Sequence, residues 1–232
     1  MRFAIIAAGN GSRLAAEGAD LPKPMLSLGG MPMIERLAGM FLNCGAERVA
    51  VIVNPTQNET VGFMRALQTR MPLDLVVKET PGPMHSLLEL APFLDGEPFC
   101  ATTVDTVFQK SGLEALLEHA RTCGADGVMG VTSYADDEKP LYVDTDEGMM
   151  IRAFLDSRGD SRFVSAGVYC LPPVALDVLR SAVADGERRM RHFQRRLLEY
   201  GLELSAFDMG RVIDVDHLAD LEEARRLIGD CR

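Results

Sequence analysis

Two short segments near the amino terminus, rich in glycine and proline, each carry a cationic side chain. They read Gly9-Asn-Gly-Ser-Arg13 and Leu21-Pro-Lys-Pro-Met25. The glycines let the backbone approach a ligand closely, and successive backbone N–H groups there can form a nest for an anion. The guanidinium of Arg13 can hold phosphate oxygens in a bidentate fork, while Lys23 is a compact point charge stiffened by its proline neighbours. These residue types predict a polyphosphate site.

Two better-known glycine motifs do not fit this segment. The dinucleotide fingerprint needs a third glycine where this chain has Leu14, and the strand expected next ends on Asn54 rather than on an acidic residue. A Walker loop needs Gly-Lys-Ser or Gly-Lys-Thr after four spacer residues, which is absent. The chain instead has G-x-G-x-R followed about ten residues later by P-K-P-M.

The segments around these motifs predict the elements that position them. Residues 3–8 form an apolar run that ends at Gly9, as expected of an inner strand of a parallel sheet. The cationic loop then lies at the carboxyl end of that strand, where open α/β sheets bind ligands. Further strands are expected at 48–53, 73–77 and 99–104, and helices at 32–44, about 59–70 and 84–94. This alternation indicates a parallel sheet with helices on both faces.

The double motif resembles that of the nucleotidyltransferases, the NTP_transferase family of sugar-1-phosphate nucleotidyltransferases (NDP-sugar pyrophosphorylases) and phosphocholine cytidylyltransferases. The resemblance extends from Phe3 to about Leu227. It implies a three-layer α/β/α, Rossmann-like fold of the glycosyltransferase-A kind, with a mixed, mostly parallel sheet and a small β-hairpin insertion. A single domain over residues 1–232 is expected, with a nucleotide-binding half of about 1–125 and an acceptor-binding half of about 126–232.

The resemblance also assigns a metal site. The strand at 99–104 runs into Asp105, which matches an aspartate that binds the catalytic Mg²⁺ in the family. Asp216 aligns with the second metal ligand, and Asp214 is a possible helper. Carboxylate oxygens suit Mg²⁺, which prefers oxygen ligands. The plainer reading of Asp105 is a strand-end residue in a turn, before a helix that a capping-box pattern places at Ser111.

For the nucleotide, the resemblance implies that Arg13 holds the leaving β- and γ-phosphates and that Lys23 holds the α-phosphate and the incoming phosphate. Backbone groups of Ala7, Ala8, Gly9 and Gly11 would line the base and phosphates. Ser86 is the base-binding candidate, because His85-Ser86 resembles the Asn-Ser of choline-phosphate cytidylyltransferases where nucleotide-sugar enzymes carry Gly-Thr-Ala. The base stays open among CTP, UTP and dTTP.

The acceptor half shows strand patterns around the turn Asp144-Thr-Asp-Glu-Gly148, which predicts a hairpin. In the family this insertion covers the second substrate and closes with a Glu-Lys pair, where this chain has Asp156. The strand Ser165-Ala-Gly-Val-Tyr169 resembles the family's N-A-G-I-Y, so Gly167 would let a sugar or alcohol phosphate lie near the backbone. Simple packing is an equal explanation of that glycine. Gly167 and Asp156 are therefore the acceptor-binding candidates, and the acceptor stays open.

Composition limits the other classes. A net charge of −10 argues against a general nucleic-acid binder, because affinity for nucleic acid comes from phosphate neutralisation. The five cysteines have no C-x-x-C spacing and are expected as core residues in a reducing compartment. No apolar run approaches a membrane span, and the run at 3–8 is too short for a signal peptide. We expect a cytoplasmic protein without a membrane partner; a homo-oligomer is possible, but nothing in the sequence requires one.

The leading functional hypothesis is Mg²⁺-dependent transfer from an NTP to a phosphorylated acceptor, a sugar 1-phosphate or an alcohol phosphate such as phosphocholine, with release of pyrophosphate. One alternative is a non-catalytic nucleotide- or sugar-phosphate-binding protein that keeps the fold. Another is an interaction module that uses a helix expected at 187–200, although a solvated face is the favoured reading of Arg188, Arg191 and Arg195. The molybdopterin guanylyltransferase branch is disfavoured, because its glycine loop ends in lysine and it lacks P-K-P.

Overall fold

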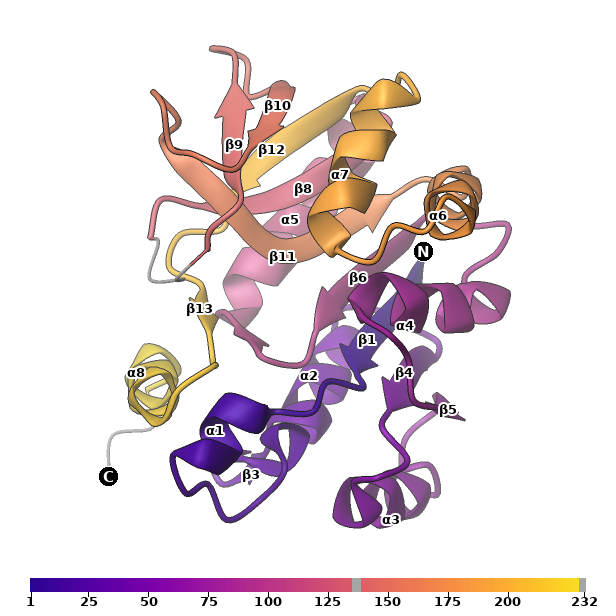
Figure 1. Ribbon diagram of the computed structural model, residues 1–232, viewed down its shortest axis with the longest axis vertical. Coiled ribbons are helices and arrows are strands. Elements are labelled where there is room, and N and C mark those ends of the chain that lie inside the picture. Colours follow the sequence, from indigo (N-terminus) through magenta and orange to yellow (C-terminus); the bar gives the residue numbers. More distant parts are fainter. Residues whose placement is uncertain (135–138, 230–232) are drawn as a thin grey trace.

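The computed structural model describes residues 1–134 and 139–229, which fold around one large mixed β-sheet (Figure 1). Its strands are β1 (Arg2–Ala7), β4 (Val49–Val53), β5 (Leu73–Val77), β6 (Phe99–Thr103), β8 (Gly127–Thr132), β9 (Tyr142–Thr145), β10 (Ile151–Leu155), β11 (Phe163–Leu171) and β12 (Leu204–Asp208). Their order is β10-β9-β11-β6-β1-β4-β5, and β8 pairs with both β11 and β12. The site loops leave this sheet at the carboxyl ends of β1 and β6.

Strand β1 is central to the packing because its side chains alternate between two cores. Phe3 and Ile5 belong to one hydrophobic cluster, and Ala4 and Ile6 belong to the other. The first cluster is covered by α1 (Ser12–Ala16), α2 (Met33–Asn43), α3 (Asn58–Leu67), α5 (Lys110–Thr122) and α8 (Leu218–Leu227). The second is covered by α4 (Pro83–Leu90), α6 (Ala175–Ala184) and α7 (Met190–Glu199). The three-layer α/β/α fold predicted from the sequence is confirmed.

The sheet changes character between its two halves. Strands β6, β1, β4 and β5 pair in parallel, with β1 between β6 and β4. The long strand β11 then runs antiparallel to β6, to β8 and to β9, and it joins the two halves in one sheet. The predicted hairpin is present as the antiparallel pair β9 and β10. The result is a parallel amino-terminal half continued by a mostly antiparallel half.

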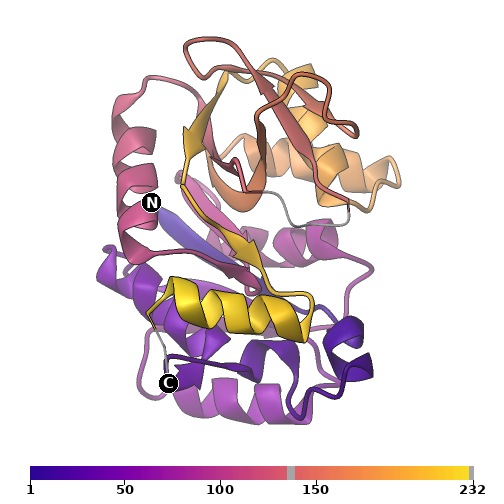
Figure 2. The same cartoon turned by 90° about the vertical axis from the view of Figure 1, so that its left-hand side faces the viewer.

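A two-residue ladder brings distant parts of the chain to the same edge of this sheet. Strand β7 (Thr106–Val107) pairs antiparallel with β13 (Ile213–Asp214), and the backbone N–H of Val215 donates to the carbonyl of Asp105 at 3.0 Å. Figure 2 shows β13 leading directly into α8. A second short ladder joins β2 (Ser27–Leu28) to β3 (Met31–Pro32) after the lysine segment. The ladder of β7 and β13 therefore brings Asp105, which directly precedes β7, close to Asp214 and Asp216 at the end of β13.

Two helix starts differ from the sequence predictions. The helix expected to begin in a capping box at Ser111 begins at Lys110, with Gln109 as its N-cap residue and no side-chain cap, and Glu114 pairs with Lys110 at 2.9 Å. The helix expected from residue 187 begins at Met190, which leaves Arg188 in the preceding loop. Helix α4 ends before Pro92, as expected of a residue that has no N–H to continue the helix.

The cysteines and the helices bear on the compartment predictions. Cys100 and Cys170 are buried, Cys44 and Cys123 are partly buried, and all four are free thiols. Cys231 lies outside the described residues. No helix in the described ranges is long and apolar enough to cross a membrane.

A truncation at Phe41 tests this core. Phe41 is fully buried, and its ring centroid lies 4.9 Å from that of Phe3 on the central strand. We expect Phe41→Ala to lower the free energy of unfolding by about 3–5 kcal/mol in urea denaturation, through lost burial and the cavity left behind. Tyr200→Ala is the control, because that ring is 59% exposed and its loss should change stability by no more than about 0.5 kcal/mol. Equal losses in the two variants would contradict the packing described.

Candidate active site

The site is built around the ammonium of Lys23. Its Nζ atom donates to Oδ2 of Asp105 at 2.6 Å and to Oδ1 of Asp216 at 2.7 Å. Arg13 donates to the other carboxylate oxygen of Asp216. Lys23 is only 8% exposed, so this cation is held inside the protein rather than at its surface. Four residues singled out in the sequence therefore form one contact network.

Local backbone structure explains why these groups meet. Lys23 begins a 3₁₀ turn after Pro22, which puts its side chain against the glycine loop. Gly11 has a φ of +60°, and a Cβ atom there would stand 3.1 Å from Cβ of Lys23. Glycine is therefore needed at position 11 both for the left-handed backbone and for room beside the lysine. Asp105 follows β6, the parallel neighbour of β1, so its carboxylate lies at the same sheet edge as the loop.

The position of Asp216 is fixed by the start of the last helix. The backbone N–H groups of Asp216 and His217 donate to Oδ2 of Asp220 at 2.9 and 2.7 Å. With His217 as the N-cap residue and Asp220 as the third residue of the first turn, this forms a capping box. Glu17 also contacts His217 and accepts the N–H of Leu218 at 2.8 Å. The hydrogen bonds at the start of α8 thus hold Asp216 in place.

The charges of the network stabilise one another. Burial alone would lower the pKa of Lys23, but Asp105, Asp216 and Asp214 together raise it well above the ordinary lysine value. Burial pushes the pKa of Asp216 up, yet the hydrogen bond and charge of Lys23, with Arg13, bring it below its usual range. Lys23 therefore stays a cation and Asp216 a carboxylate at neutral pH.

The three carboxylates at this edge also fit a divalent metal ion. Asp105, Asp214 and Asp216 each offer an oxygen, and these oxygens lie within 4.8 Å of one another. Oδ1 of Asp105 is buried and has no hydrogen-bond partner among the described residues, so one acceptor is left for a ligand. With Arg13 and Lys23 the cluster has one negative charge in excess. An all-oxygen donor set of this charge suits Mg²⁺.

A cavity of about 500 Å³ opens beside the network on the amino-terminal half. All the predicted nucleotide-binding residues line it: Ala7, Ala8, Gly9, Gly11 and Ser86. Ser86 is buried, and its hydroxyl lies 2.6 Å from that of Thr80, which lines the same cavity. Arg13, Lys23 and Asp105 also line it, so the cationic groups and the metal candidates face the same space.

Sequence reasoning missed the side chains that shape this loop. The buried amide of Asn54 donates to the carbonyl of Ala8 at 3.3 Å and to the side chain of Asn10 at 2.8 Å. Gln57 donates to the carbonyl of Gly9 at 2.9 Å. The usable signal was the place of Asn54 at the end of the second predicted strand, since parallel neighbours end at the same edge. Asn54 was noted only as the absence of an acidic residue.

A second cavity, of about 600 Å³, lies on the carboxyl-terminal half and shares Arg13, Gly82 and Asp216 with the first. Gly167 and Asp214 line it, and Gly167 lies where the register of β11 against β8 shifts.

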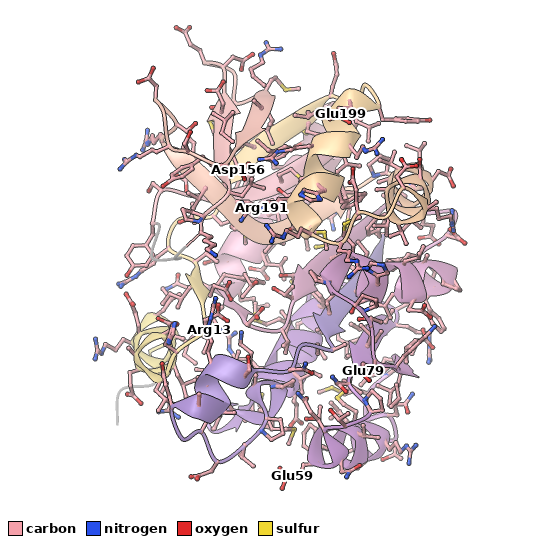
Figure 3. The ribbon with its side chains drawn as sticks, viewed as in Figure 1. Arg13, Glu59, Glu79, Asp156, Arg191 and Glu199 are labelled. Carbon is pink, nitrogen blue, oxygen red and sulfur yellow. The ribbon has the colours of Figure 1, made fainter. Side chains whose placement is uncertain are left out.

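Asp156 is not among the residues that line the second cavity. It pairs with Arg191 at 2.7 Å and with Arg195 at 2.9 Å (Figure 3). Both arginine side chains are partly exposed and Asp156 is 62% exposed, so the pairing is compatible with the charged, solvated face that the sequence favours. Of these three residues only Arg191 lines the cavity.

Comparison with known proteins identifies the family. Residues 3–199 match the model of the MobA-like NTP transferase domain. The chain belongs to this family. The match includes both cationic motifs and Asp105, whereas Asp214 and Asp216 lie beyond it. The nucleotidyltransferase recognised from the sequence is confirmed, while the roles of single residues and the branch within the family stay predictions.

Relatives and solved structures agree with this family. The chain is 26% identical to the bifunctional protein GlmU of a Synechococcus strain over 99% of its own length and 38% of that protein. It is 24% identical to the UTP–glucose-1-phosphate uridylyltransferase AglF of Haloferax volcanii, over 97% of this chain and 96% of AglF. The chain spans only 38% and 53% of two GlmU relatives that it matches.

Among solved structures, the inositol-1-phosphate CTP transferase from T. maritima superposes with a TM-score of 0.80 at 21% identity, covering 99% of this chain and 97% of that one. A glucose-1-phosphate thymidylyltransferase from Bacillus anthracis superposes with a TM-score of 0.85 at 19% identity, covering 100% and 96%. At these identities the likeness establishes the fold, which is the mixed α/β architecture described above.

Gly82 tests the close approach of two backbone segments between the two cavities. It lines both, and a Cβ atom there would stand 2.9 Å from the backbone carbonyl oxygen of Arg188. We expect Gly82→Ala to destabilise the protein by about 1–3 kcal/mol in thermal unfolding, because one of two backbone segments must move. Gly62→Ala is the matched control, since that helical glycine has open space and the change should stabilise by about 0.5–1 kcal/mol. A neutral or stabilising Gly82→Ala would refute the close approach.

Proposed function

We propose that this domain transfers the nucleotidyl group of an NTP to a phosphorylated acceptor, a sugar 1-phosphate or an alcohol phosphate, and releases pyrophosphate. The observation that carries the proposal is the contact of Lys23 with Asp105 and Asp216 at the junction of the two cavities. Family membership and relatives such as the uridylyltransferase AglF support it. We place the domain in the cytoplasm, in keeping with the free thiols of its described cysteines.

The reaction is an in-line displacement at phosphorus. An oxygen of the acceptor phosphate forms a bond to the α-phosphorus of the NTP, and the bond from that phosphorus to the bridging oxygen of the β-phosphate breaks. The electron pair leaves with pyrophosphate, so no covalent intermediate on the protein is needed. Catalysis then consists of positioning two anions and offsetting their charge.

We assign Asp105 and Asp216 to hold Mg²⁺, with Asp214 as a helper. When bound, the ion would supply positive charge beside the phosphates at an oxygen-lined site. Mg²⁺ is proposed because the donors are carboxylates and because Oδ1 of Asp105 is left without a partner among the described residues. The same carboxylates keep Lys23 protonated and in place.

The cationic side chains divide the remaining work. The ammonium of Lys23 has three N–H donors and uses two on the carboxylates, so one remains for an α-phosphate or acceptor-phosphate oxygen. Arg13 lines both cavities and would hold the β- and γ-phosphates of the leaving group. Backbone groups of Ala8, Gly9 and Gly11 would lie along the nucleotide, with Ser86 on the base side.

The alternatives are less well supported by the contacts. A non-catalytic binding protein would have no need of a buried lysine shared by two carboxylates at the junction of two cavities. An interaction module built on α7 would have to use Arg191 and Arg195, which Asp156 already pairs with. Neither alternative accounts for the three carboxylate oxygens gathered at one edge.

Removal of single charges tests the roles assigned. In Asp105→Asn, Asp216→Asn and Lys23→Met we expect kcat to fall by at least about 100-fold, because these groups act on charge that develops in the transition state. Pyrophosphate release with a confirmed substrate pair is the measurement, and circular dichroism checks folding. Glu59→Gln is the matched control, because Glu59 is exposed on α3 (Figure 3) and lines neither cavity, so kcat should stay unchanged. Wild-type turnover in Asp105→Asn would remove Asp105 from the mechanism.

Nucleotide choice is tested by thermal unfolding with CTP, UTP, dTTP, GTP and ATP, each with and without Mg²⁺. A nucleotide present at about 100 times its Kd should stabilise the protein by about 2.7 kcal/mol and raise its Tm. We expect a Mg²⁺-dependent rise with CTP, UTP or dTTP. A rise with none of the five would count against nucleotide transfer altogether.

A further inference from the structure

The second cavity has walls of opposite charge. Its end near β13 carries Asp214, Asp216 and Asp220. The wall formed by α7 and the loop before it carries basic residues that no step of the proposed reaction uses: Arg188, Arg189 and Arg191, with Lys139 nearby. In a chain of net charge −10, a group of cations on one cavity wall is a local feature rather than a property of the whole surface.

These cations are not equally available to a ligand. Arg191 is fixed, because it pairs with Asp156 at 2.7 Å and donates to the carbonyl of Lys139 at 2.8 Å. Arg188 and Arg189 are exposed and make no ion pair within the described residues. Two arginines therefore line the cavity without an ion pair among the described residues, beside a third that is held in place by its contacts.

Helix α7 adds to this cationic end. Arg189 is its N-cap residue, and no side chain caps the first turn. The N–H groups of a helix's first turn carry partial positive charge and readily bind an anion by donating hydrogen bonds to it. The helix has ten residues, and its first turn contributes Met190 and Arg191 to the cavity wall.

A buried amide gives independent evidence of a ligand at this wall. Gln194 lines the cavity, yet it is only 3% exposed. Its Nε2 donates to the hydroxyl of Tyr169 at 3.1 Å, and its Oε1 has no hydrogen-bond partner among the described residues. A buried amide oxygen without a partner is costly, and a ligand hydroxyl would satisfy it.

We propose that the acceptor carries, besides the phosphate that attacks, a second anionic group that Arg188 and Arg189 bind at the start of α7. A hydroxyl of the same molecule donates to Gln194. The inference rests on the proposed function in one respect, that the acceptor occupies this cavity. It favours acidic sugar or polyol phosphates and disfavours phosphocholine, because the quaternary ammonium group would face two arginines.

Matched acceptor pairs test the proposal by isothermal titration calorimetry on the whole chain. Glucuronic acid 1-phosphate is compared with glucose 1-phosphate, and 3-phosphoglycerate with glycerol 3-phosphate. In at least one pair we expect the carboxylate-bearing member to bind about tenfold more tightly, as a charge-assisted contact provides. The double variant Arg188→Gln/Arg189→Gln should reduce that preference to less than about twofold.

The control variant is Arg65→Gln/Arg226→Gln, which removes two exposed arginines outside the cavity and gives the same change in net charge. It should keep the preference. Equal affinity within both pairs, tighter binding of phosphocholine than of either acid, or a preference that survives in Arg188→Gln/Arg189→Gln would overturn the inference.

Pyrophosphate release, assayed in parallel, separates this inference from the proposed function. Turnover with glucose 1-phosphate but no preference for either acid would leave nucleotide transfer standing and overturn the second anionic group. An arginine-dependent preference for an acid without turnover by any NTP would support the anion site and count against nucleotide transfer.

Discussion

A buried cation shared between two carboxylates is the interaction on which the site depends. Asp105, Asp214 and Asp216 come within 4.8 Å of one another, and like charges at that separation repel. Lys23 offsets this repulsion from inside the protein, and the carboxylates in return make its burial tolerable. Neither the ammonium of Lys23 nor the carboxylates that it contacts would be stable in these positions alone, because a buried charge without a partner is strongly unfavourable. The glycine at position 11 is required by the same contact, since it makes room for the lysine.

The rest of the fold serves to bring these groups to one edge. Parallel pairing of β1 with β6 places the glycine loop beside Asp105, and β11 attaches the second half of the sheet to β6. The carboxyl-terminal segment then returns through β13 to complete the acidic group. Two cavities result, one over the parallel half and one over the antiparallel half, and both reach Arg13 and Asp216.

Much of this could be predicted from the sequence where the signals are local. The apolar run before Gly9, the hairpin around residues 144–148 and the strand at Leu73–Val77 were placed closely, because periodicity and turn residues report backbone structure directly. The residues of the cationic motifs were found for the same reason. Their mutual contacts were not, because the spacing of motifs carries no information on which carboxylate a lysine meets. The capping box at Ser111 was wrong because the helix begins one residue earlier, at Lys110, and Gln109 takes the N-cap position.

Features that depend on tertiary contacts were harder to predict. Asp156 is predicted to contact the acceptor, and the sequence gives no sign that it also pairs with two arginines of α7, from a segment some 35 residues earlier in the chain. Asn54 had only its place at a strand end as a signal, and its hydrogen bond to the glycine loop follows from the pairing of β4 with β1. In both cases the decisive partner is distant in sequence, so a single chain without structure contains the residue but not its role.

The ladder of β7 and β13 has a consequence for how the protein folds. Lys23 and Asp216 are 193 residues apart, so their contact closes almost the whole chain into one loop. Contacts of such long sequence separation cost chain entropy and form slowly. The amino-terminal strands β1, β4 and β5 pair across shorter sequence separations and are able to assemble first, whereas the acidic group is complete only after β13 docks. The charged cluster thus also joins the two ends of the chain. A ligand that bridges the cluster would stabilise the fully folded state, in which these ends are in contact.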